Sequence, residues 1–166
     1  MNLSHIFVQL GFSQKTTLDL TLLLVIVLIS FLFGMFIGRY RLITVLINIY
    51  VSIAIINAVS VKLLPDYSNR LLLFLGSILV LTILGKKMFE LPISGGGKGF
   101  LWRVFAMSFL EIMLVLSTVL TIVPKKVALE YISPNAYDYL ALNNAPLFWM
   151  LLPLIFMFLI NKKIGR

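Results

Sequence analysis

The chain has 166 residues, of which 61% are hydrophobic and only 12% are charged, and its formal net charge is +8. So few charged side chains cannot cover a globular domain in water, which excludes an ordinary soluble protein and predicts an integral membrane protein. The absence of cysteine excludes disulfides, thiolate metal ligands and a cysteine nucleophile. We therefore expect an all-α, polytopic transmembrane helical bundle, a single domain over residues 1–166, with the lipid bilayer as its partner.

Long uncharged stretches mark the predicted membrane spans, because a helix needs roughly 20 apolar residues to cross a hydrocarbon core of about 30 Å. The stretches lie at about residues 20–38, 42–61, 69–87, 104–123 and 145–160. The last one contains Pro153 and is predicted to be either a kinked span or a shallow re-entrant piece. The connection at 125–146, with a break at Pro134, is predicted to lie along the membrane interface. The sequence thus predicts four to five spans with short interfacial helices.

The basic residues predict the orientation of these spans. With five spans, one side of the membrane carries Arg39, Arg41, Lys86, Lys87, Lys98, Arg103, Lys162, Lys163 and Arg166, and the other carries Lys15, Lys62, Arg70, Lys125 and Lys126. Since cytoplasmic loops carry an excess of Lys and Arg, the first side is predicted to be cytoplasmic, with the N-terminus outside and the C-terminus inside a bacterial inner membrane. Basic residues that flank apolar segments do not form a nucleic-acid face, but the loop from Lys86 to Arg103 could bind anionic lipids.

The glycine-rich stretch "LPISGGGKGFLWRVF" raises the question of a nucleotide site. A phosphate-binding loop of the Walker type needs a second glycine five residues before its Gly-Lys pair and a serine or threonine after it. Here Pro92 and Gly99 occupy those positions around Gly97 and Lys98. We interpret the glycines as a hinge between two membrane segments: Gly95, Gly96, Gly97 and Gly99. No serine, histidine and carboxylate form a catalytic set and His5 is the only histidine, so we expect no enzyme, no cofactor and no metal site.

One carboxyl group lies inside the predicted fourth span. Glu111 is eight residues beyond Arg103, which places it roughly 12 Å into the helix. Carboxyl groups in spans face the bundle interior or a water-filled cavity and mark proton or ion pathways, and without a partner they favour the neutral form. The predicted polar site comprises Glu111, Ser108, Thr118, Asn48, Ser52 and Asn57. The other interpretation is a hydrogen-bonded tie between helices, and the sequence leaves both open.

Small residues recur every fourth position on the first two spans. The first span carries Ser30, Gly34 and Gly38, and the second carries Thr44, Asn48 and Ser52. Such stripes let helix backbones approach closely. We expect them to pack against each other within the chain, with a homo-oligomer or a larger membrane complex as the alternative.

The order of these parts resembles the colicin V production protein (CvpA) family of small bacterial inner-membrane proteins. The resemblance covers about residues 20–125 and is carried by "GMFIGRYRLI", "LTILGKKMFE", the glycine connection and "WRVFAMSFLEIMLVLSTVL". It implies an accessory or transport-related role in envelope homeostasis or toxin secretion, with no catalytic residues to carry over. Two other hypotheses come from the residues themselves: a small channel or proton-coupled transporter that uses Glu111, and a structural subunit of a larger membrane complex.

Overall fold

The structure is a computed structural model, and it describes residues 14–37, 41–60, 62–85 and 100–164. Within these ranges the chain is all-α, with seven helices and no strand, which confirms the all-α part of the predicted fold class. The helices are α2 (Gln14–Ile37), α3 (Leu42–Ala58), α4 (Tyr67–Gly85), α5 (Phe100–Ile122), α6 (Lys125–Ala128), α7 (Pro134–Ala141) and α8 (Ala145–Ile164).

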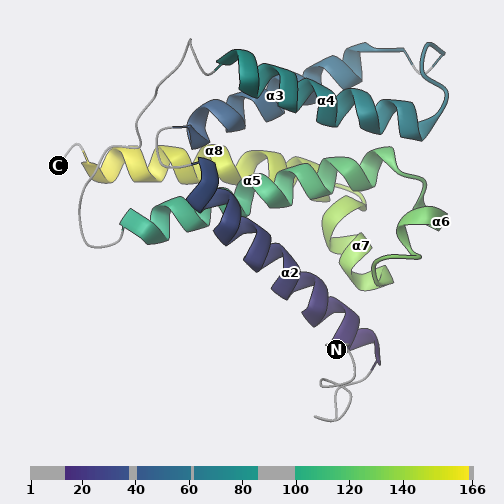
Figure 1. The fold of residues 1–166 in the computed structure, drawn as a ribbon. Helices are drawn as coiled ribbons and strands as arrows, with labels where there is room; N and C mark the ends of the chain where they lie inside the picture. Colours follow the sequence, from purple (N-terminus) through teal and green to yellow (C-terminus); the bar gives the residue numbers. More distant parts are fainter. Residues whose placement is uncertain (1–13, 38–40, 61, 86–99, 165–166) are drawn as a thin grey trace.

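Helix α5 lies at the centre of the bundle and contacts α2, α3, α4, α7 and α8 (Figure 1). The α3–α4 hairpin lies on one side of α5, α8 runs alongside it, and α2 crosses it obliquely. The long helices run in alternating directions, so the end of α2 and the start of α5 share one end of the bundle, which we call the basic end. The α7 end, at the opposite side, holds the start of α2 and the end of α5.

Three helices are long and apolar enough to cross a membrane by themselves. The qualifying segments are Asp19–Phe36 in α2, Tyr67–Gly85 in α4 and Leu101–Ile122 in α5. Helices α7 and α8 pass the same test together as a pair bent by 60°, as a broken span or a re-entrant loop. The described chain therefore has three candidate spans, or four if the bent pair is one, as expected for an integral membrane protein.

The second predicted span is shorter in the structure than in the sequence. Helix α3 has 17 residues and ends at Ala58, so it covers about 25 Å, less than a hydrocarbon core of about 30 Å. The apolar run continues to Val61, but the backbone turns to an extended conformation at Val59, with ψ at 121°. The length of the apolar run therefore overestimated the length of the helix. Nine of its 17 side chains are buried, and the helix packs mainly against α4.

A defined turn between α7 and α8 produces the bend. Ser133 caps α7 by accepting a 3.1 Å hydrogen bond from the Ala136 N–H, and Pro134 occupies the first turn. After α7, Leu142 is extended and Asn143 has a left-handed φ of 52°, which asparagine tolerates better than most residues. Helix α8 is continuous from Ala145 to Ile164 and includes Pro153. The sequence predicted a kink at Pro153, whereas the 60° bend lies before α8, between α7 and α8.

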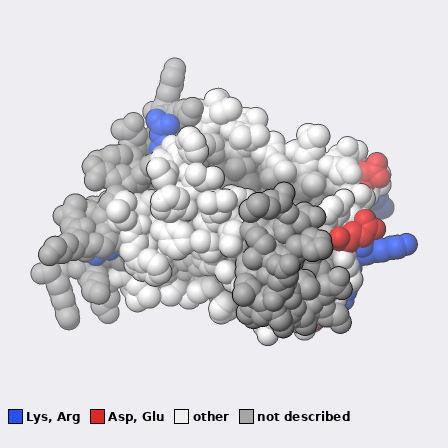
Figure 2. All heavy atoms as spheres, turned by 60° about the horizontal axis from the view of Figure 1, so that its bottom comes forward, with Lys and Arg blue, Asp and Glu red and all other residues white. Residues whose placement is uncertain are grey.

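Charged side chains gather at the two ends of the molecule, with an uncharged band between them on the face that Figure 2 shows. Among the described side chains, the charged groups at the basic end are Arg41 and Arg103. The α7 end carries equal numbers of basic and acidic side chains: Lys62, Arg70, Lys125, Lys126, Asp19, Asp66, Glu130 and Asp138. Such a band between charged ends is the pattern that a bilayer requires.

Candidate functional site

The candidate site is centred on Glu111 at the midpoint of α5. Glu111 lies eleven residues from both Phe100 and Ile122, about 16 Å from either end of the helix. Its side chain is completely buried, and the buried Met107 and Leu114 lie one turn away on the same helix face. The helix periodicity turns this face toward the interior of the bundle. If α5 crosses the membrane, Glu111 therefore lies at the depth where polar groups cost most.

Neither carboxyl oxygen of Glu111 has a hydrogen-bond partner among the described residues. The same holds for the hydroxyl of Ser108, which is fully buried one turn earlier on α5. Leaving a buried polar group unsatisfied costs about 1–3 kcal/mol. The burial of Ser108 and Glu111 therefore destabilises the fold and needs a reason other than packing. Nor does the described part of the chain gather three potential metal ligands from His, Cys, Asp and Glu.

Tyr50 lies at the middle of α3, a helix that packs against α5, and the sequence pattern did not single it out. Its hydroxyl donates a hydrogen bond to the Met150 carbonyl and so joins α3 to α8. Tyr50 is the midpoint of α3, as Glu111 is of α5, and this central position in an apolar run could be read from the sequence.

The polar residues predicted on the second span have other roles in the structure. Asn48 is buried and donates a 3.3 Å hydrogen bond to the Thr82 hydroxyl, which ties α3 to α4. Ser52 is buried and donates to the Asn48 carbonyl within α3. Asn57 is exposed near the end of α3. The structure therefore brings none of these three side chains into a hydrogen bond with Glu111.

Thr118, the remaining predicted site residue, donates a 2.9 Å hydrogen bond to the Leu114 carbonyl of its own helix. Like Ser52, it satisfies its hydroxyl locally, as serine and threonine do in membrane helices. Of the predicted set, Ser108 and Glu111 are left as the buried side chains with unsatisfied polar atoms within the described ranges. These two residues form the core of the candidate site.

Gly34 brings α2 directly against this site. A Cβ atom at position 34 would lie 2.8 Å from the Ser108 Oγ and 3.3 Å from the Val104 Cγ1. Ser30, one turn earlier, is buried and donates to the Ile26 carbonyl. The small residues of α2 thus face α5 inside the chain, while Gly38 and the hinge glycines at 95–97 and 99 lie outside the described residues.

In comparisons with known proteins, no family model, no curated protein and no solved structure matches this chain. The functional argument therefore depends on the geometry of the buried site and on the composition of the helices around it.

Proposed function

We propose that this protein is a small proton-coupled channel or transporter, in which Glu111 binds and releases a proton at the centre of the membrane. The observation that carries the proposal is the complete burial of a carboxyl group whose two oxygens have no hydrogen-bond partner in the described chain. Carboxyl groups inside membrane proteins typically serve proton or ion pathways. The proposal includes no enzymatic step.

The competing structural interpretation of Glu111 requires a partner on another helix. A polar tie between spans contributes about 0.6 kcal/mol on average, and it does so only through a hydrogen bond. The structure has such ties elsewhere: Asn48 to Thr82, and Tyr50 to Met150. Glu111 forms none among the described residues, which supports a functional role over a tie.

The test is proton flux in proteoliposomes that contain equal amounts of inserted protein. Glu111→Gln keeps the size of the side chain but removes the titratable proton, so its flux should fall to that of empty liposomes. Glu130→Gln is the matched control, because Glu130 is exposed at the α7 end, and its flux should equal that of the unchanged protein. Equal flux from the unchanged protein and Glu111→Gln would rule out Glu111 as the proton-binding group.

Absence of flux from the unchanged protein would favour an accessory role in place of autonomous transport. The layout of residues 20–125 resembles the CvpA family, and we propose on that basis a setting in envelope homeostasis or toxin secretion at a bacterial inner membrane. In that case deletion of the gene should alter envelope integrity or toxin export, and Glu111→Gln should complement the deletion as well as the unchanged protein does.

A structural role in a larger complex is the second candidate, and the exposure of α2 favours it. Phe31, Met35 and Phe36 are among the α2 side chains that are more than half exposed, although the opposite face of the helix packs on α5. An unpartnered apolar helix face can pack on another membrane protein as well as on lipid. Cysteine-scanning crosslinks along α2 in native membranes would detect such a partner.

A further inference from the structure

A trough lies on the face of α5 opposite Glu111, between α2 and α8. At the α7 end this trough is filled, because Tyr137 and Leu140 of α7 pack against Leu120 of α5. Leu22 of α2 and Trp149 of α8 pack against the same cluster from the two sides. Helix α7 therefore acts as an apolar plug for one half of the trough.

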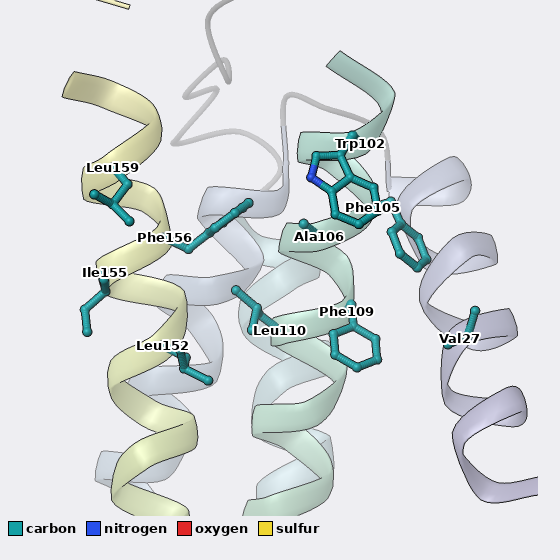
Figure 3. A pocket seen from close by; sticks show the side chains of 10 residues that line it. All are labelled: Val27, Trp102, Phe105, Ala106, Phe109, Leu110, Leu152, Ile155, Phe156 and Leu159. Carbon is teal, nitrogen blue, oxygen red and sulfur yellow. The ribbon is translucent and has the colours of Figure 1, made fainter. Parts of the chain in front are cut away.

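The other half of the trough is an open groove of about 460 Å³ (Figure 3). Phe105 and Phe109 of α5 line it, with Phe156 of α8 on one side and Val27 of α2 on the other. Every lining residue is apolar or aromatic, and Trp102 at its outer end is 68% exposed. No helix in the described chain fills this half of the trough, whereas α7 fills the other half.

The dimensions of the groove favour a hydrocarbon chain as its occupant. The lining of α5 runs from Trp102 to Leu110, about 12 Å along the helix, which is close to the depth of about 15 Å for one leaflet. A hydrocarbon chain is thinner than a helix, which is about 10–12 Å across with its side chains, and can lie along a lining of this length.

The charges at the mouth of the groove favour an anionic headgroup. The groove reaches the basic end at Trp102, and the described basic residue beside it on α5 is Arg103. The acidic side chains that the structure describes outside the bundle interior all lie at the opposite end. Basic groups beside the membrane surface attract anionic lipids.

We propose that this groove is a binding site for an anionic phospholipid, with one acyl chain between α2, α5 and α8 and the phosphate at the basic end. In one leaflet the acyl chain would complete the apolar packing around α5, as α7 does in the other leaflet. The proposal is independent of transport and of Glu111, because it depends on a different face of α5.

The test measures quenching of tryptophan fluorescence by brominated acyl chains. In the variant Trp149→Phe, Trp102 is the remaining tryptophan and lies in the groove. The protein is reconstituted in phosphatidylcholine vesicles with increasing fractions of brominated phosphatidylglycerol or brominated phosphatidylcholine. Half-quenching of Trp102 should need about fivefold less brominated phosphatidylglycerol than brominated phosphatidylcholine. A preference of this size is what one basic side chain near the headgroup provides. In the variant Trp102→Phe, Trp149 reports from the filled half and should show no preference.

A groove-filling variant supplies a second arm of the same test. Ala106 lines the groove, so Ala106→Phe should abolish the preference of Trp102 for the anionic lipid. Leu101→Phe adds an aromatic ring at a neighbouring exposed position outside the lining and should preserve it. A photoactivatable phosphatidylglycerol with a diazirine in its acyl chain should label α5 and α8 of the unchanged protein, with competition from unlabelled phosphatidylglycerol only, and this measurement needs no variant.

Three results would overturn the proposal. Equal quenching of Trp102 by the two lipids would reduce the groove to ordinary lipid contact. A preference that survives Ala106→Phe would place the lipid elsewhere. Protection of Trp102 from both brominated lipids would show that a protein helix covers the groove.

Discussion

The two faces of α5 differ in what they bury. One face carries Ser108 and Glu111 into the bundle interior, where both side chains are fully buried, and α5 packs against α2 and α3. The opposite face carries Phe105 and Phe109 into an apolar groove. Every residue that lines the groove is apolar or aromatic, as expected for a face open to lipid, where polar groups are costly. The difference indicates that the interior face holds polar chemistry and the groove face holds apolar packing.

The largest expected effect comes from breaking the contact between α2 and the polar face. Gly34→Leu should lower the free energy of unfolding by about 3 kcal/mol, because the new side chain would overlap Ser108 and Val104. Gly76→Leu is the matched control, since a Cβ atom there meets nothing within 4 Å, and it should be close to neutral. Unfolding in detergent micelles titrated with SDS measures both variants. Equal losses at the two glycines would contradict the contact.

A milder version of this change isolates the Ser108 hydroxyl. Gly34→Ala should be destabilising, and Ser108→Ala in the same chain should restore part of the loss, because the closest contact, at 2.8 Å, is to the hydroxyl oxygen. The double-mutant cycle then gives the coupling between the two positions. A coupling energy of zero would mean that α2 moves away from α5 when the methyl group is added.

Replacing the carboxyl on the polar face should stabilise the protein. Glu111→Leu removes two unsatisfied oxygens from a buried position and should raise the free energy of unfolding by about 2 kcal/mol, while transport is lost. Glu111→Gln should gain less, because the amide is still polar. The same SDS titration measures both. A loss of stability in Glu111→Leu would identify Glu111 as a structural tie.

A smaller effect is expected where α7 is attached to α5. The Ser117 hydroxyl donates a 2.6 Å hydrogen bond to the Leu140 carbonyl, one of the last carbonyls of α7 and therefore without a helical partner. Ser117→Ala should cost about 1.5 kcal/mol and raise hydrogen exchange in α7. Thr121→Ala should have little effect on either, because the exposed Thr121 hydroxyl bonds only its own helix. Unchanged exchange in α7 would contradict this attachment.

The smallest effect concerns the link between α3 and α8. Tyr50→Phe removes the hydrogen bond to the Met150 carbonyl, which lies inside α8 and keeps its position in the helical ladder. The free energy of unfolding should therefore fall by only about 0.6 kcal/mol. If proton flux also falls in this variant, Tyr50 contributes to the transport site as well as to packing.

Much of the helical framework could be predicted because apolar runs are local features of the sequence. The structure places α5 at Phe100–Ile122 where 104–123 was expected, and α4 at Tyr67–Gly85 where 69–87 was expected. The partners of individual polar side chains could not be predicted in the same way. Asn48 was a candidate partner of Glu111, yet it bonds Thr82, because the rotation of α3 against α4 decides which side chains meet.

Amino-acid composition and order were enough to predict most of the apolar helices and the position of Glu111 well inside α5. These properties accumulate along the chain and need no knowledge of neighbours. The tertiary structure alone decided that α3 ends at Ala58, that the chain bends at Asn143, and that α7 fills half of the trough beside α5. Those features depend on contacts between residues far apart in sequence, and only the packed helices bring such residues together.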